Sequence, residues 1–95
     1  DMSVDFERMQ VYISDEPIKL SATEYRILEL LIKNKGRVLT RDMIIQKIWD
    51  DNENYVDENT LNVHIRRLRQ KIEKDAGNPE YVITVFGIGY TFGET

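Results

Sequence analysis

The side chains best suited to chemistry form a basic segment in the second half of the sequence. Between residues 61 and 72 there are four cations and no acid: Arg66, Arg67, Arg69 and Lys71. Guanidinium and ammonium groups bind phosphate, and an arginine can also donate two hydrogen bonds to one guanine. The preceding stretch, residues 50–58, has five acids and no base: Asp50, Asp51, Glu53, Asp57 and Glu58. Positive charge is therefore concentrated in one short segment, which suits a polyanionic partner such as nucleic acid.

Helical periodicity separates the basic segment into two faces. Four apolar residues recur at a spacing that places them on one side of a helix, where we expect a core: Leu61, Ile65, Leu68 and Ile72. The opposite side carries Asn59, Val63, Arg66, Arg67 and Gln70, flanked by Thr60 and Asn62, with His64 and Arg69 nearer the core. Arginine can recognise guanine, asparagine can recognise adenine, and a valine methyl can contact the thymine methyl. The plain alternative is a solvated helix face, although such a face is expected to mix glutamate with its basic residues.

Composition limits the classes of protein to which the chain can belong. With 95 residues, 41% of them hydrophobic and 32% charged, it is predicted to form one globular domain over residues 1–95. It contains no cysteine, which excludes disulfides and thiolate metal sites and suits a reducing, cytoplasmic compartment. No apolar run approaches the roughly 20 residues of a membrane helix. The formal net charge of −4 would argue against a polyanionic partner if the charges were mixed, but they are segregated.

The sequence gives little support for an enzymatic function. There is a single histidine, and the glycines at residues 87–89 lie in a predicted hairpin, whereas phosphate-binding glycine loops open a helix. We therefore expect no catalytic residue, no metal and no cofactor.

The first half of the sequence predicts short strands followed by a helix. Apolar and polar residues alternate around Val4 and Phe6 and again over residues 9–13, as in antiparallel strands. Residues 14–17 are predicted to form a turn, and residues 18–20 a short third strand. Ser21 and Glu24 have the spacing of a capping box, which predicts a helix that continues to a left-handed C-cap at Gly36.

The second half predicts two more helices and a hairpin. Thr40 is a suitable N-cap for a helix ending near Trp49, and Asp57 for the basic helix, which is expected to reach about Lys74. Residues 81–92 alternate in pattern and are interrupted by Gly87-Ile88-Gly89, which is typical of a β-hairpin. Strands, three helices and a terminal hairpin make an α+β fold with the element order of a winged helix-turn-helix. In that architecture the third helix enters the major groove of DNA and the hairpin lies against the neighbouring backbone.

Several short motifs, by their order and spacing, resemble the C-terminal output domains of OmpR/PhoB response regulators over essentially the whole chain. They are Leu20-Ser21-Ala22-Thr23-Glu24-Tyr25, Val38-Leu39-Thr40-Arg41, Ile48-Trp49, Val56-Asp57, residues 60–72, and Thr84-Val85 with Gly87-Ile88-Gly89-Tyr90. The resemblance implies a four-stranded antiparallel N-terminal sheet, three helices and a C-terminal hairpin wing. It implies sequence-specific binding to tandem direct-repeat half-sites of double-stranded DNA, and regulation of transcription. It also implies an upstream receiver domain, phosphorylated on an aspartate by a sensor histidine kinase, that controls assembly on DNA.

The resemblance implies roles for individual residues as well. It implies that Arg67, Val63 and Asn62 read bases. It also implies that seven residues contact the DNA backbone: Thr60, His64, Arg66, Arg69, Thr84, Tyr90 and Trp49. The acidic loop, with Asp50, Asp51, Glu53 and Asn54, corresponds to a segment that can contact RNA polymerase. Alternatives remain, since Trp49 and Tyr90 can serve mainly in packing, and the acidic loop can be a solvated surface. Arg69 can instead pair with Glu73, four residues on.

The tip of the predicted wing departs from this family. Where the family commonly has a basic residue between the valine and the first glycine, this sequence has Phe86, and Thr91 stands at another position that is often basic. The whole stretch of residues 81–92 is uncharged. Because apolar residues surround Phe86 and an alternating strand turns one face inward, we expect its ring to pack within the hairpin rather than on sugars. The uncharged wing and the net acidity leave open a winged helix that binds protein instead of DNA, and domains of similar fold also occur in membrane-anchored one-piece regulators.

Overall fold

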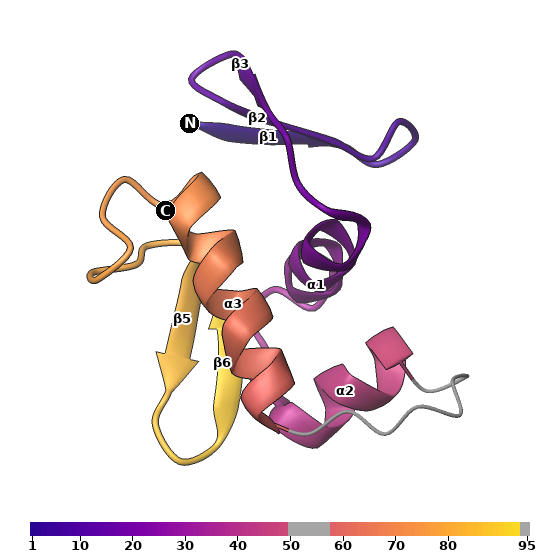
Figure 1. Cartoon of the computed structure of the whole chain (residues 1–95), viewed down its shortest axis with the longest axis vertical. Helices are drawn as coiled ribbons and strands as arrows, with labels where there is room; N and C mark the ends of the chain where they lie inside the picture. Colours follow the sequence, from indigo (N-terminus) through magenta and orange to yellow (C-terminus); the bar gives the residue numbers. More distant parts are fainter. Residues whose placement is uncertain (50–57, 94–95) are drawn as a thin grey trace.

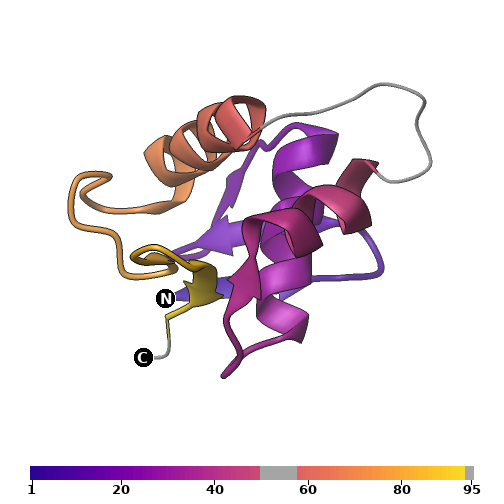
Figure 2. The same ribbon diagram turned by 90° about the horizontal axis from the view of Figure 1, so that it is seen from below.

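Two antiparallel sheets and three helices make up the computed structural model, which describes residues 1–49 and 58–93 (Figure 1). In chain order the elements are β1 (Met2–Asp5), β2 (Gln10–Ile13), β3 (Glu16–Ile18), α1 (Ala22–Lys33), β4 (Leu39–Thr40), α2 (Arg41–Trp49), α3 (Glu58–Ile72), β5 (Val82–Val85) and β6 (Gly89–Phe92). The sheet of β1–β3 lies at one end of the molecule, and the turn between β5 and β6 lies at the other end, as does the start of α3 (Figure 1). Seen from below, α1 and α2 lie on one side, and α3 and the hairpin on the other (Figure 2). The predicted α+β winged-helix architecture is confirmed.

The N-terminal sheet corrects two expectations. Among the described residues it has three strands in the order β1-β2-β3, not the four that the resemblance implied. The turn between β2 and β3 consists of Ser14 and Asp15, whose φ angles of +50° and +69° fit a two-residue type I′ hairpin. Because the turn is so tight, β3 begins at Glu16, earlier than the predicted strand at residues 18–20. Pro17 is accommodated because β3 is an edge strand, which needs ladder hydrogen bonds on one side only.

Helix α1 begins as the sequence predicts and ends differently. The Ser21 hydroxyl accepts a hydrogen bond from the Glu24 backbone N–H at 3.1 Å, and the Glu24 carboxylate accepts one from the Ser21 N–H at 2.9 Å, which confirms the capping box. The helix ends at Lys33, and Asn34 is its C-cap, with a side-chain amide that donates to the Leu30 carbonyl at 2.8 Å. The left-handed residue is Gly36, with a φ of +88°, two positions beyond the cap rather than at it.

The core lies where the three helices meet, and the apolar periodicity of the sequence locates it correctly. The four predicted inward residues of α3 are all buried: Leu61, Ile65, Leu68 and Ile72. They belong to one cluster with buried residues of the other elements: Val11, Tyr25, Ile27, Leu28, Leu31, Leu39, Ile44, Ile48, Val82 and Tyr90. Burial of this continuous apolar surface is the main favourable free energy of folding, and it fixes α3 with one face inward and the other in solvent.

The hairpin is part of a three-stranded sheet that the sequence pattern did not reveal. Strand β4, only two residues long, pairs with β6, so the strand order is β4-β6-β5. Leu39 is in register with Tyr90, and Thr40 with Gly89. A Cβ atom at Gly89 would lie 2.0 Å from the Leu39 carbonyl oxygen, so this close pairing requires glycine at that position. The segment before α2 thereby ties the wing to the helical core.

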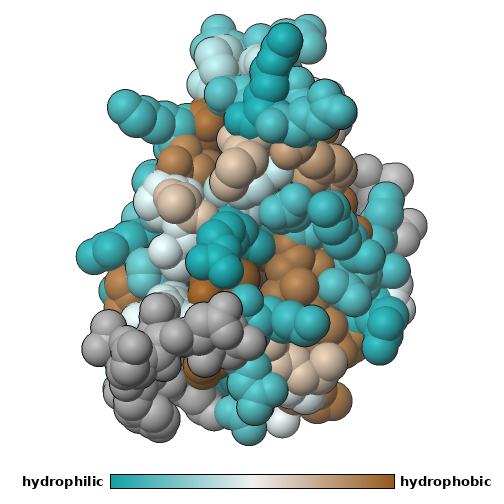
Figure 3. All heavy atoms as spheres, turned by 90° about the vertical axis from the view of Figure 1, so that its right-hand side faces the viewer, coloured by the Kyte–Doolittle hydropathy of each residue, from teal (hydrophilic) through white to brown (hydrophobic). Residues whose placement is uncertain are grey.

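The surface over α1 and α2 is largely hydrophilic, with smaller apolar areas between the polar side chains (Figure 3). The outward positions of α1 and α2 include charged groups such as Arg26, Lys33 and Lys47, which are exposed. None of the helices in the described part of the chain is long and apolar enough to span a bilayer.

Candidate nucleic-acid interface

The outer face of α3 carries the predicted base-reading side chains on one continuous surface. Asn62, Arg66 and Arg67 are exposed, and Val63 is half-buried between them. Asn62, Val63 and Arg66 line a shallow surface hollow together with Asn59. Within residues 1–49 and 58–93, neither Arg66 nor Arg67 forms an ion pair or a hydrogen bond, so both guanidinium groups can bind an external acceptor.

Asn62 is held in place by the wing. The Tyr90 hydroxyl, from β6, donates a hydrogen bond to the Asn62 side-chain oxygen Oδ1 at 3.0 Å. Tyr90 itself is buried, so its ring packs in the core as the alternative for this residue proposed. The hydrogen bond from Tyr90 restricts the orientation of the Asn62 amide, which keeps two N–H donors and one Oδ1 lone pair for an external partner.

Arg69 joins α3 to β5. Its Nε and Nη2 atoms donate to the Val82 carbonyl at 3.0 and 2.7 Å, and Nη2 also donates to the Thr84 hydroxyl at 2.7 Å. Its guanidinium carbon lies 5.8 Å from the centroid of the Tyr90 ring. These contacts leave Nη1 for an acceptor outside the described residues. Two predicted backbone-contact residues, Arg69 and Thr84, are therefore bound to one another.

The alternative pairing of Arg69 with Glu73 is wrong. The buried Glu73 carboxylate instead accepts hydrogen bonds from the backbone N–H groups of Glu80, Tyr81 and Val82, at 2.7–3.2 Å. A carboxylate that accepts several backbone donors forms strong, charge-assisted bonds, so Glu73 fixes the chain just where β5 begins. Glu73 and Arg69 together set the angle between α3 and the wing.

Trp49 and His64 contact each other at the junction of α2 and α3. Their ring centroids are 5.6 Å apart with a 45° tilt between the planes. The His64 Nδ1 atom is buried and has no hydrogen-bond partner within the described residues. Packing is thus a demonstrated role of both residues, and their predicted contact with DNA backbone stays a prediction.

Lys71 belongs to the basic segment but serves the interior of the protein. Its Nζ atom lies 2.7 Å from Oε1 of Glu24, at the start of α1. Burial of Glu24 by itself raises the pKa of this carboxyl, but the hydrogen bond and the charge of Lys71, with the Ser21 N–H, outweigh burial and lower the pKa. The sequence gives no signal for this pair, because its members are 47 positions apart and only the folded core brings them together.

Arg41 is a cation near the wing that sequence reasoning missed as a site residue. Its guanidinium carbon lies 5.3 Å from the Tyr90 ring centroid, on the first turn of α2. The only signal was its place in the Val38-Leu39-Thr40-Arg41 motif. The Tyr90 ring is thus near the guanidinium groups of two helices, Arg41 of α2 and Arg69 of α3.

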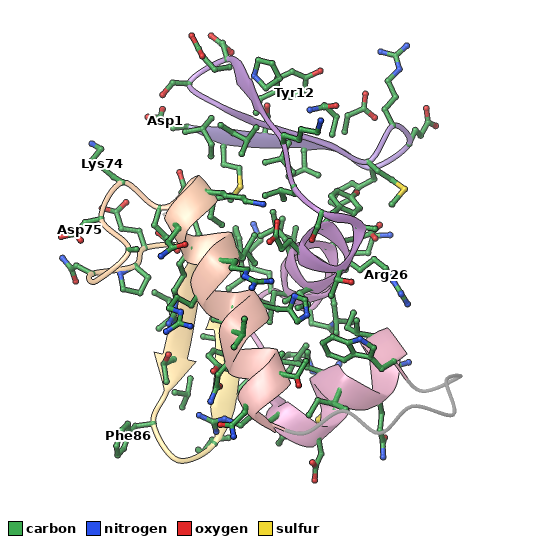
Figure 4. The ribbon with its side chains drawn as sticks, viewed as in Figure 1. Asp1, Tyr12, Arg26, Lys74, Asp75 and Phe86 are labelled. Atoms are coloured by element: carbon green, nitrogen blue, oxygen red, sulfur yellow. The ribbon has the colours of Figure 1, made fainter. Side chains whose placement is uncertain are left out.

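The expected packing of Phe86 within the hairpin is wrong. The side chain is 96% exposed and projects from the turn away from the rest of the protein (Figure 4). Strand β5 ends at Val85, so the inward and outward alternation that predicted packing does not extend to Phe86. The Ile88 N–H closes the turn by donating to the Val85 carbonyl at 2.9 Å, and Phe86 occupies a corner of that turn.

The predicted polymerase-contact residues, Asp50, Asp51, Glu53 and Asn54, lie outside the described residues. Within residues 1–49 and 58–93, no three or more histidine or acidic side chains gather in a way that could hold a metal ion.

Comparison with known proteins gives one consistent result. Residues 15–92 match the family model described as "Transcriptional regulatory protein, C terminal". The sensory transduction protein RegX3 of Mycolicibacterium smegmatis is 48% identical over 88 residues, which cover 92% of this chain and 38% of RegX3. The chain therefore spans well under two thirds of the length of such curated relatives.

Solved structures agree with the sequence matches. The response regulator DrrB of Thermotoga maritima, described as an OmpR/PhoB homologue, superposes with a TM-score of 0.91 at 32% identity, over 99% of this chain and 42% of DrrB. The DNA-binding domain of RstA from Klebsiella pneumoniae, solved in complex with the RstA box, superposes with a TM-score of 0.84 at 27% identity, over 97% of this chain and 90% of that domain.

Proposed function

The chain belongs to the C-terminal transcriptional regulatory domains of OmpR/PhoB response regulators, DNA-binding modules rather than enzymes, and we propose that its α3 helix reads base edges in the major groove. The observation that carries this proposal is the outer face of α3, where Arg66 and Arg67 are exposed and have no acidic partner among the described residues. The RstA domain, solved in complex with its DNA box, supports DNA binding by a domain of this fold.

The proposed roles follow from where the side chains lie. Arg67, Val63 and the Asn62 amide read bases from the exposed face of α3. Arg66 contacts phosphate from the same face, and Arg69, through Nη1, does so from beside the wing. The remaining contacts with the DNA backbone are assigned to residues at the edge of this surface: Thr60, His64, Thr84, Tyr90 and Trp49. Tyr90 and Trp49 act there mainly by packing and positioning their neighbours.

The setting of the domain is proposed from its family. Residues 1–95 form one effector domain, which works in the cytoplasm downstream of a receiver domain phosphorylated by a sensor histidine kinase. Two copies bind tandem direct-repeat half-sites of double-stranded DNA. The segment with Asp50, Asp51, Glu53 and Asn54 contacts RNA polymerase.

The test is selection of bound sequences from a random pool of duplex DNA, followed by titration of variants on the selected site. We expect Arg67→Ala to cost about 1–3 kcal/mol on that site and to relax the preference at one base position. Arg66→Ala should weaken binding to every sequence and reduce the salt slope by about 0.9, because one phosphate contact is lost.

Arg26→Ala is the matched control, since Arg26 is an exposed arginine on α1 that points away from α3 and the wing (Figure 4). Its removal should leave affinity, preference and salt slope unchanged. If Arg67→Ala retained the full sequence preference of the unmodified domain, the outer face of α3 would not be the base-reading surface. If the domain bound protein and ignored DNA, the selection would return no preferred sequence.

A further inference from the structure

The outer sides of α1 and α2 form a groove to which the proposed DNA interface assigns no residue. It consists of two adjoining hollows, together the α1–α2 groove, that share Leu30, Asn34 and Lys47. One hollow extends to Met43 in the first turn of α2, and the other extends to Arg26 on α1. Arg26, Leu30 and Asn34 follow one another at every fourth residue, so they form one row, about 12 Å long, along α1.

The floor of the α1–α2 groove is apolar. Leu39 and Ile48, which line it, are buried in the core, and Leu30 is half-buried. Met43 is 41% exposed, and its unbranched, polarizable side chain suits a surface that adapts to another apolar group. Figure 3 shows apolar areas between the hydrophilic side chains over α1 and α2. Burial of this floor by a partner would therefore be favourable.

The rim of the α1–α2 groove is positively charged. Arg26 of α1 and Lys47 of α2 are exposed, and neither forms an ion pair or a hydrogen bond within residues 1–49 and 58–93. Glu29 also lines the groove, but its carboxylate is paired with Lys33 Nζ at 3.1 Å, so this pair adds no net charge. An apolar floor between two unpaired cations is complementary to a segment that carries carboxylates on either side of an apolar side chain.

The α1–α2 groove lies away from the surface that binds DNA. Figure 2 shows α1 and α2 on one side of the molecule and α3 with the hairpin on the other. The Arg26 side chain points away from α3 and the wing (Figure 4). The groove is therefore not covered when α3 binds the major groove.

We propose that the α1–α2 groove binds a short acidic segment of another protein, with one large apolar side chain on Leu30 and Met43 and carboxylates on Arg26 and Lys47. DNA fits this surface less well, because phosphates would pair with the cations and leave the apolar floor in water. A second copy of the domain is disfavoured by size, since a stable protein–protein interface buries roughly 1,200–2,000 Å² and one short row of side chains offers much less. A domain bound to DNA through α3 thereby holds a partner protein on its other side.

The experiment uses a displayed library of random peptides of about 12 residues, a length that forms roughly three helical turns. The library is selected against the domain held on duplex DNA, so that DNA covers the cations of α3 and acidic peptides are not retained there. We expect the selected peptides to share one large apolar residue flanked by aspartate or glutamate. One of them, labelled with fluorescein, is then titrated with protein variants in the presence and absence of the duplex.

Arg26→Ala and Lys47→Ala should each weaken peptide binding by about threefold, and Lys47→Glu by about tenfold, with less effect at high salt because exposed charges are screened. Met43→Ala should weaken binding at every salt concentration, because it removes an apolar contact. Lys74→Ala is the matched control, since Lys74 is an exposed lysine on the opposite side of the molecule from Arg26 (Figure 4). An unchanged melting temperature for each variant establishes that the fold is intact.

Opposite effects of two arginine variants separate this proposal from the proposed function. Arg26→Ala should weaken peptide binding and leave DNA binding unchanged, whereas Arg67→Ala should weaken DNA binding and leave peptide binding unchanged. A library that returns no binding peptide, selected peptides without acidic residues, or equal peptide affinity of Lys47→Glu and unmodified protein overturns the proposal. Release of the peptide by excess duplex also overturns it, because the peptide would then occupy the DNA surface. Self-association of the free domain that Lys47→Glu abolishes overturns it too, since the occupant would be a second copy.

Discussion

Tyr90 is the residue at which the helix surface and the wing are joined. Its hydroxyl donates to Asn62 Oδ1, and the guanidinium carbons of Arg41 and Arg69 lie 5.3 and 5.8 Å from the centroid of its buried ring. An asparagine that reads adenine uses both its oxygen and its amide N–H groups. The Tyr90 hydroxyl occupies one lone pair of Oδ1 and restricts rotation of the amide, so the direction in which Asn62 presents its two N–H donors and its remaining lone pair to a base edge depends on Tyr90.

Tyr90→Phe tests this positioning role, because it keeps the ring and removes only the hydroxyl. We expect the preferred base opposite Asn62 to change, since the amide can then rotate, and the domain to lose about 1 kcal/mol of stability with the hydrogen bond. Repeating the sequence selection and measuring thermal unfolding gives both results. Tyr25→Phe is the matched control: the Tyr25 hydroxyl is buried without a hydrogen-bond partner in the described residues, so its loss should not destabilise the protein or alter base preference. Identical selected sequences for both variants would show that Tyr90 does not orient Asn62.

At the scale of single residues, the sequence predicts burial well and partners poorly. The inward and outward faces of α3 follow from a period that a helix enforces, so Leu61 and Arg67 could be assigned correctly. The partners of Arg69 and Glu73 could not, because both bind the backbone of a segment whose position depends on the packing of the whole hairpin. The prediction that Phe86 packs inward was wrong because it applied the inward and outward alternation of a strand to a residue beyond Val85, where β5 ends.

At the scale of elements, α1 and α3 are connected by the ion pair of Glu24 and Lys71. Glu24 also closes the capping box of α1, so a single carboxylate serves the first turn of one helix and the last turn of another. Glu24 is 3% exposed, and removing its partner would leave a carboxylate in the interior with only the Ser21 N–H. Lys71→Met is therefore expected to destabilise the domain by about 1–3 kcal/mol, less than a fully buried pair, because the lysine side chain is 40% exposed.

The lowered pKa of Glu24 predicts a pH dependence of stability. A carboxyl whose pKa is lower in the folded state than in the unfolded chain stabilises the fold above its ordinary pKa of 4.5, and this contribution is lost as the pH falls through the lower folded value. Urea unfolding at pH 7 and at acid pH should show a smaller loss of stability for Glu24→Gln than for the unmodified domain. Glu29→Gln is the control, since Glu29 forms only a surface pair with Lys33 at 3.1 Å. Equal pH dependence for Glu24→Gln and unmodified protein would contradict this role of the ion pair.

The elements that sequence patterns located are those with enough residues to show a period or a cap. Ser21 and Glu24 predict the start of α1, and the glycines on either side of Ile88 predict the turn of the hairpin. Strand β4 is two residues long and has no period, so its pairing with β6 had no signal in the sequence. The early start of β3 at Glu16 depended on Ser14 and Asp15 adopting positive φ, which serine rarely does outside such turns.

At the scale of the whole molecule, charge is distributed so that a protein of net charge −4 can bind DNA. Two of its acids, Glu24 and Glu73, are buried and bonded internally, and five more lie in residues 50–58 of the sequence. The outer face of α3 carries none between residues 61 and 72. Local potential, not net charge, steers a polyanion to its site, and the segregated charges also orient the domain as it approaches.

We expect the isolated domain to be monomeric in solution, because the exposed large apolar side chains of residues 1–49 and 58–93 are few: Phe6, Met9, Val38, Met43, Phe86 and Ile88. On DNA we expect two copies to bind direct-repeat half-sites about 10 base pairs apart, on the same side of the duplex. A monomer carries its α3 surface and its wing side by side, joined by the Arg69–Thr84 and Tyr90–Asn62 hydrogen bonds. A direct repeat therefore points the wings of both copies in the same direction along the duplex, whereas an inverted repeat reverses one copy. Sedimentation of the free domain, and titration on direct and inverted repeats built from the selected half-site, measure both expectations. Moving one half-site by about five base pairs should abolish joint binding, since it places the second copy on the opposite side of the helix. A stable symmetric dimer in solution that prefers the inverted repeat would contradict this geometry, while leaving the reading of a single half-site by α3 intact.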